Sequence, residues 1–121
     1  MANSTEWTIE WYEMQGGRVP LRTYLDSLPE ADRKRAFALL TMLEARGNQI
    51  REPHSKLVEA GLMELRGGGS SQVRMFYTFR PGRRIVVLDG ILKKQDALPR
   101  ELVERMRVYR RDVESREQKA Q

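Results

Sequence analysis

The chain has 121 residues, no cysteine and a formal net charge of +5. This is the length of a single domain, and the lack of cysteine excludes disulfides and thiolate chemistry, as is usual in a reducing cytoplasm. No apolar run is long enough to span a membrane, and the start, MANSTEW, lacks the basic and then apolar layout of a signal peptide. We therefore expect one domain over residues 1–121, in the cytoplasm and without a membrane partner.

The positive charge is concentrated in one segment of the chain. Residues 66–94 carry seven basic and one acidic side chain, a net of +6, whereas residues 1–65 carry a net of −2 and residues 95–121 a net of +1. Such a concentration favours a polyanionic partner, either a nucleic acid or an acidic protein segment. The alternative is a solvated basic sheet edge, because lysine and arginine also protect exposed strands from unwanted pairing.

The amino-terminal half predicts a strand followed by two helices. Residues 7–12, WTIEWY, alternate as a strand does, and residues 19–28 form a short helix. Ser27 to Glu30 has the spacing of a capping box and opens a second helix, which ends at Gly47. Its apolar residues recur at helical spacing, at Ala36, Leu39, Leu40 and Leu43. We expect the two helices to form a hairpin on one face of a sheet.

The carboxy-terminal half predicts four strands, over residues 56–58, 62–66, 72–80 and 84–92. In the third strand, Val73, Met75, Tyr77 and Phe79 are expected on one face, and Arg74, Phe76 and Thr78 on the other. Gly90 indicates a β-bulge or a close backbone approach in the fourth strand.

The last predicted element is a helix that begins at Pro99. Its narrow apolar stripe comprises Leu102, Met106, Tyr109 and Val113. The tail, at about residues 114–121, has little apolar anchorage and is expected to fray. The order of all these elements predicts an α+β fold.

Neither a metal nor a cofactor is expected. His54 is the only histidine, and the acidic residues do not have ligand spacing. The sequence GGGSS after Arg66 is not a phosphate-binding P-loop, because that motif continues with lysine into a helix and a strand follows here. Glycine in this position more simply permits positive φ in a hairpin turn.

A meander of the last three strands would bring distant cations to one rim. Arg66 and Arg74 flank GGGSS, and Lys93 and Lys94 end the strand that would return to the same edge. Such a rim suits metal-independent RNA cleavage, in which the ribose 2′-OH attacks its own phosphate and the protein transfers protons and stabilises charge. The alternative is structural: Arg74 in a salt bridge, or Arg66 paired with Glu64.

Two residues are candidates for proton transfer. His54 is the only histidine, the side chain most often used as general acid or base, and Glu64 is a candidate base. Both positions also suit ordinary surface residues. Tyr77 shares the face of Val73 and Met75, which indicates the core.

The segment from Lys56 to Pro99 resembles HigB-like toxins and phage Gp49-like proteins of the RelE/ParE superfamily. The residues that carry the resemblance are Glu64-Leu65-Arg66, Arg74 to Tyr77, the apolar strand 85–92, Lys93-Lys94 and Pro99. The strand and two helices before them look similar as well. The resemblance implies a RelE-like fold: an antiparallel sheet with a mixed edge, an amino-terminal helical hairpin on one face and a carboxy-terminal helix.

The resemblance also implies a function. It implies the toxin of a type II toxin–antitoxin system, which enters the ribosomal A site, cleaves mRNA as a metal-independent endoribonuclease and is neutralised by a helix-turn-helix antitoxin. Arg74 and Lys94 would hold the phosphate, with Arg66 nearby and with Glu64 or His54 as candidate proton-transfer groups. The remaining cations would bind RNA, namely Lys56, Arg80, Arg83, Arg84 and Lys93. Many relatives place tyrosine or histidine after the last strand, and QDALP has neither, so the general base stays open.

Two other functions remain open. One is a ParE-like toxin that poisons gyrase, and the other is a non-catalytic basic phage-type protein that binds nucleic acid or a partner. The basic strand ends favour an RNA target over gyrase, because ribosomal RNA and mRNA supply dense phosphate. They do not separate the nuclease from the binding protein.

Overall fold

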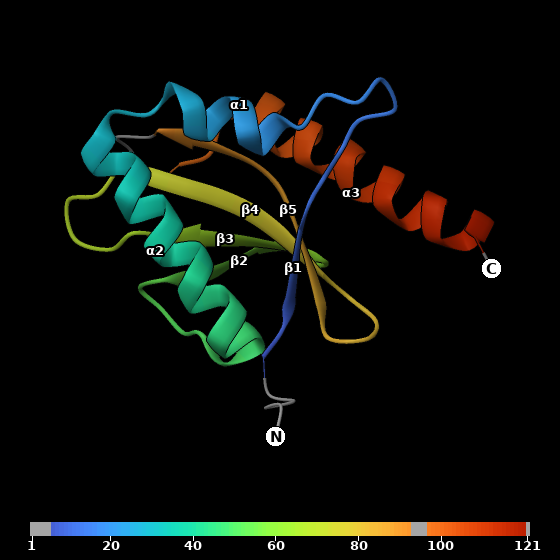
Figure 1. The fold of residues 1–121 in the computed structure, drawn as a ribbon, viewed down its shortest axis with the longest axis horizontal. Coiled ribbons are helices and arrows are strands. Elements are labelled where there is room, and N and C mark those ends of the chain that lie inside the picture. The colour runs from blue at the N-terminus through green and yellow to red at the C-terminus, as the bar shows by residue number, and fades with distance from the viewer. Residues whose placement is uncertain (1–5, 93–96, 121) are drawn as a thin grey trace.

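The computed structural model describes residues 6–92 and 97–120, which form one sheet with helices on both faces (Figure 1). The elements are β1 (Thr8–Trp11), α1 (Pro20–Ser27), α2 (Glu30–Arg46), the 3-10 turn η1 (Gly47–Gln49), β2 (Ser55–Glu59), β3 (Leu62–Arg66), β4 (Val73–Arg80), β5 (Arg84–Leu92) and α3 (Arg100–Ala120). The strand order is β1-β5-β4-β3-β2, with β1 parallel to β5 and the other pairs antiparallel. The predicted α+β fold with a mixed sheet edge is confirmed.

The sheet separates two hydrophobic cores. Alternate residues of β4 face opposite helices, since Val73, Met75 and Tyr77 pack in the core beneath α1 and α2, and Phe76 packs in the core beneath α3. This is the alternation that the sequence predicts. The predicted stripe of α3 is buried in the second core: Leu102, Met106, Tyr109 and Val113. The central strands therefore carry apolar residues on both faces, which explains their nearly continuous hydrophobicity.

The predicted capping box at the start of α2 is not formed. Ser27 Oγ donates to the Tyr24 carbonyl oxygen at 2.7 Å, and Pro29 is the residue at the N-cap position. The hydroxyl bonds within the last turn of α1 because that carbonyl lies three residues before it. The junction is held instead by Arg33 of α2, whose guanidinium donates to the carbonyl oxygens of Leu25 and Leu28, each at 3.0 Å.

Gly90 allows α1 to lie directly on β5. The β4–β5 register passes from Phe76 opposite Asp89 to Tyr77 opposite Val87, so the strand contains a bulge. A Cβ at Gly90 would lie 2.4 Å from the Tyr24 ring and 2.8 Å from the Arg74 carbonyl oxygen. The sequence predicted either a bulge or a close backbone approach at Gly90, and the structure has both.

The final helix does not fray after Val113. It continues to Ala120, and Glu117 near its end accepts hydrogen bonds from Arg80 and Arg84. The predicted frayed tail is therefore wrong for the described residues. The prediction was based on the lack of apolar anchors after Val113. Ion pairs hold this end of the helix against the sheet instead, and apolar periodicity does not reveal ion pairs.

Replacement of Gly90 by alanine should destabilise the fold. The added methyl group would collide with a ring and with a backbone oxygen, and only the ring can move aside, so we expect a loss of about 1–3 kcal/mol in the free energy of unfolding. Urea denaturation measures this loss. Gly16→Ala is the matched control, because nothing lies within 4 Å of a Cβ there. Equal stability of the two variants would contradict the proposed close packing of Tyr24 on β5.

Candidate functional site

The predicted convergence of strand ends is present around the β3–β4 loop. Arg66 and Arg74 lie directly opposite each other in the register, at the two ends of the loop. Leu92, at the end of β5, lies opposite Val73, so this strand ends at the same edge. Lys93 and Lys94, which were predicted to complete the rim, lie outside the described residues.

Arg74 is buried rather than presented to solvent. Its side chain is 9% exposed, and its Nε lies 3.3 Å from Glu64 Oε2, on a carboxylate that is 5% exposed. Its Nη1 donates to the carbonyl oxygens of Ser71 at 2.9 Å and Val73 at 3.0 Å. Of the two roles expected for Arg74, contact with phosphate or a salt bridge, the structure shows the salt bridge. Its guanidinium offsets the charge of Glu64 and holds the loop.

The GGGSS loop is an ordered turn. The Ser71 N–H donates to the Gly68 carbonyl oxygen at 3.1 Å, and the Val73 N–H donates to Ser71 Oγ at 3.2 Å. Arg35, an exposed residue of α2, lies against the same loop, with its Cδ 3.2 Å from the position that a Cβ of Gly67 would take. Nothing in the sequence points to Arg35, because no local signal relates a helix residue to a loop about thirty residues later.

His54 and Lys56 complete this end of the sheet. His54 Nδ1 lies 3.1 Å from the Arg66 carbonyl oxygen, and the Arg66 N–H donates to the His54 carbonyl oxygen at 2.7 Å. Lys56 is exposed on β2, directly opposite Glu64 on β3. Four predicted residues, His54, Lys56, Glu64 and Arg66, are therefore neighbours. We call these four with Arg74 the loop-end cluster.

A pocket of about 350 Å³ opens beside Glu64. Its lining combines one lysine and one carboxylate with mostly apolar walls, and comprises Lys56, Leu57, Val58, Glu64, Ala97, Leu98 and Val103. Such a lining suits a ligand with a flat apolar part and a polar edge. The arrangement offers a carboxylate held in place by a buried arginine, next to a cation at the rim.

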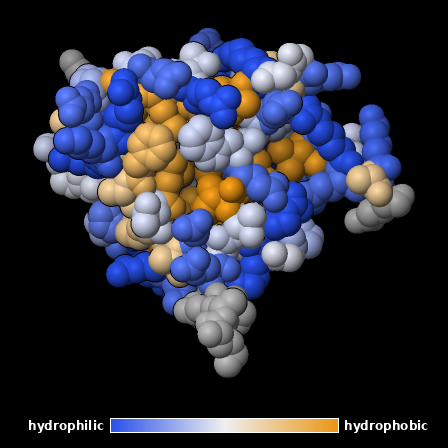
Figure 2. Space-filling view, in the orientation of Figure 1, coloured by the Kyte–Doolittle hydropathy of each residue, from blue (hydrophilic) through white to orange (hydrophobic). Residues whose placement is uncertain are grey.

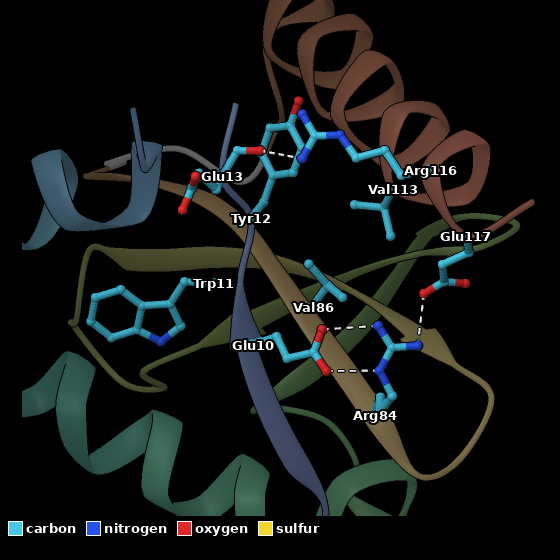
Figure 3. Close-up of a pocket in the computed structure, with 9 residues that line it drawn as sticks. All are labelled: Glu10, Trp11, Tyr12, Glu13, Arg84, Val86, Val113, Arg116 and Glu117. Carbon is cyan, nitrogen blue, oxygen red and sulfur yellow. Dashed lines mark hydrogen bonds and ion pairs between the residues drawn. The ribbon is translucent and has the colours of Figure 1, made fainter. Parts of the chain in front are cut away.

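The other predicted RNA-binding arginines do not join the loop-end cluster. Arg80 is six residues beyond Arg74 on β4, which is about 20 Å along a strand at roughly 3.4 Å per residue. Arg84 donates to Glu10 at 2.7 and 2.9 Å and to Glu117 at 2.7 Å (Figure 3). The Arg83 guanidinium lies 4.5 Å from the centre of the Trp7 ring. Acids from β1 and α3 and the Trp7 ring therefore engage Arg80, Arg83 and Arg84 away from Arg74, and RNA binding by these three arginines stays a prediction.

These ion pairs shift the pKa values of the glutamates. The hydrogen bonds from Arg84 hold the pKa of Glu10 below its ordinary value of 4.5, and those from Arg80 and Arg84 do the same to the pKa of Glu117. Asp89, on the face of the sheet that carries Glu64, shows the opposite effect. Burial raises its pKa, although the Gly90 N–H donates to its Oδ1 at 2.7 Å.

The end of α3 should loosen in acid. Because the folded-state pKa of Glu117 is depressed, its stabilising contribution is complete above the ordinary glutamate pKa and is lost as pH falls below it. We expect the last turns of α3 to lose order below about pH 4.5, the ordinary pKa. Amide hydrogen exchange of residues 114–120 measures this change. In the Glu117→Gln variant, these amides should exchange faster at neutral pH, and their exchange should change little with acid. A steep acid response in that variant would contradict the assignment.

Replacement of Arg74 by alanine should cost stability, not only function. Removal of one member of a buried ion pair leaves the charge of Glu64 uncompensated, at a cost of about 3–5 kcal/mol in the free energy of unfolding. Denaturant titration measures it. Lys34→Ala is the matched control, because its pair with Glu30 is 77% and 81% exposed and should contribute little. The double variant Glu64→Leu, Arg74→Met should recover much of the loss, and a fully stable Arg74→Ala protein would contradict this role.

Two kinds of site are absent from the part of the chain that the structure describes. Within residues 6–92 and 97–120, no group of three or more histidine, cysteine or acidic side chains is placed to hold a metal ion. Within the same ranges, no helix is long and apolar enough to cross a membrane.

Comparison with protein families gives a match. A family model described as "Phage derived protein Gp49-like (DUF891)" matches residues 23–110, which contain most of α1, all of α2, the strands β2 to β5 and about half of α3. A comparison with curated proteins found no match. The matched range includes every residue of the loop-end cluster.

Proposed function

Because the chain belongs to the Gp49-like family of phage-derived proteins, within the RelE/ParE-like toxin superfamily, we propose that it is the toxin of a type II toxin–antitoxin pair and cleaves mRNA on the ribosome. Proteins of this family are commonly toxin-like in toxin–antitoxin systems. The match to the family model confirms the resemblance found in the sequence. An antitoxin is the partner that this function requires, and the ribosome with its mRNA is the target.

One observation supports RNA cleavage above the rest: Glu64, which is paired with the buried Arg74, lines a pocket at the loop-end cluster. A general base must be held at a fixed place, and an arginine 3.3 Å from the carboxylate does this. We assign Arg74 a positioning role rather than direct contact with phosphate. The burial of Arg74 is compatible with this role, because a positioning residue does not need to reach the substrate.

The chemistry that we propose needs no metal. The Glu64 carboxylate takes the proton of the ribose 2′-OH, and the 2′-oxygen forms a bond to the adjacent phosphorus. The bond from phosphorus to the 5′-oxygen breaks, and that oxygen takes a proton from the His54 ring. Lys56 and Arg66 neutralise the charge that develops on the non-bridging oxygens. The products are a 2′,3′-cyclic phosphate and a 5′-hydroxyl end.

Induced expression of the wild-type chain should arrest growth and leave mRNAs cut within codons. Glu64→Gln should lower the cleavage rate at least about a hundredfold, because general acid–base catalysis contributes on this scale. Primer extension on ribosome-bound mRNA measures it. Since Glu64→Gln also disturbs a buried pair, circular dichroism accompanies the assay, and the double variant Lys56→Ala, Arg66→Ala tests the same site with less effect on the core.

The controls separate this function from the alternatives. Lys34→Ala, on the exposed face of α2, should cleave as the wild type does. Unchanged cleavage in folded Glu64→Gln would exclude Glu64 as the base. Growth arrest with intact mRNA and broken DNA would instead indicate a gyrase-directed toxin, and a lack of arrest would indicate a non-catalytic binding protein.

A further inference from the structure

The strand β1 is one edge of the sheet and offers part of its backbone outward. Among the described residues it pairs only with β5. The Thr8 N–H donates to the Arg83 carbonyl oxygen, in the turn before β5, at 2.9 Å, and the Tyr12 N–H donates to the Val87 carbonyl oxygen of β5 at 3.0 Å. In a parallel ladder, the N–H and C=O groups of one residue point to the same side of the strand, and those of the next residue point to the other side. Because Thr8 and Tyr12 bond toward β5, the N–H and C=O groups of Ile9 and Trp11 point to the open edge. Figure 1 shows β1 in front of the sheet, with α2 on one side and α3 on the other.

On the α2 side, β1 borders an apolar groove of about 260 Å³. Its lining is mostly apolar and comprises Ile9, Trp11, Phe37, Leu40, Thr41 and Glu44. Phe37 is 45% exposed, an unusual degree for a phenylalanine of a small domain. Figure 2 shows hydrophobic surface gathered beside β1 toward α2, with hydrophilic surface around it.

On the α3 side, β1 borders a second pocket, of about 220 Å³ (Figure 3). Its charged lining residues are Glu10, Glu13, Glu117, Arg84 and Arg116, a net of −1. Both arginines are already bonded, Arg84 to two of these carboxylates and Arg116 to Asp112 at 2.8 Å. The Glu13 carboxylate points away from the arginines in Figure 3. The pocket therefore favours an incoming cation.

We propose that β1 accepts an extended segment of a second polypeptide as a sixth strand of the sheet. The side chains of an added strand alternate between the two faces, so those beside Ile9 and Trp11 enter the apolar groove and those beside Glu10 enter the acidic pocket. The fitting segment alternates apolar residues such as valine with basic residues such as lysine. Backbone hydrogen bonds to Ile9 and Trp11 hold it, and the two pockets select its sequence.

The charges disfavour a second copy of this chain as the occupant. Antiparallel pairing of two β1 strands would bring Glu10 and Glu13 of both copies to the same face, and like charges opposite each other destabilise a sheet. A separate polypeptide with basic residues has the complementary charge. The surface lies at the sheet edge opposite β2, so it does not depend on the proposed RNA cleavage at Lys56 and Glu64.

Peptide titration followed by proton–nitrogen correlation NMR tests the proposal. The probe is acetyl-Val-Lys-Val-Lys-Val-Lys-Val-amide, and the controls are the same peptide with glutamate for lysine and with an N-methylated central valine. We expect shifts at the amides of Ile9 and Trp11 and at the Trp11 indole, and at least about tenfold weaker binding of both controls. Phe37→Ser should weaken binding about tenfold. Val108→Ser should not, because Val108 is equally apolar and 59% exposed but lies on α3.

Three results would overturn the proposal. They are no shift at millimolar probe, shifts centred on Lys56 and Arg66 instead, and a dimer in sedimentation whose β1 amides are already protected from exchange. Glu64→Gln should bind the probe as the wild type does. Loss of RNA cleavage and loss of peptide binding are therefore separate outcomes.

Discussion

The pairing of β4 with β5 between two hydrophobic cores is the constraint on which the rest of the structure depends. These strands bury apolar side chains on both faces, so a slip of one residue would exchange the residues packed under α1 and α2 with those under α3. The bulge beside Asp89 and the absence of a side chain at Gly90 adjust this pairing so that Tyr24 fits against the strand. Because the register is fixed, the ends of β3, β4 and β5 meet at one edge, and the loop-end cluster follows from it.

Ion pairs between distant segments decide what the charged residues do. The arginines of β4 and β5 that make residues 66–94 so basic are largely engaged: Arg74 with Glu64, Arg80 with Glu117, and Arg84 with Glu10 and Glu117. Their partners come from β1, β3 and α3. A segment with a net charge of +6 in the sequence therefore does not produce a basic patch of the same size on the surface. The long helix α3 is held at its end by these pairs where apolar contacts are lacking.

The two edges of the sheet have different chemistry. At the edge formed by β2 and β3, a carboxylate that a buried arginine positions opens to a pocket with a lysine at its rim. At the edge formed by β1, open backbone groups lie between an apolar groove and an acidic pocket. The proposed RNA-cleavage site and the proposed strand-docking surface therefore lie on opposite sides of the sheet.

The sequence by itself determined the elements, their order and the faces of β4, because these depend on local periodicity, turn residues and alternation along the chain. It also placed Arg66 and Arg74 together, since a short loop leaves few ways to pair consecutive strands. The tertiary structure alone decided that Ser27 ends α1 instead of capping α2, that Arg35 lies on the glycine loop and that Arg74 is buried with Glu64. Each of these depends on which atoms from distant segments come within bonding distance, and a one-dimensional pattern does not contain that distance. The sequence shows which side chains are charged, but the fold decides which groups they pair with.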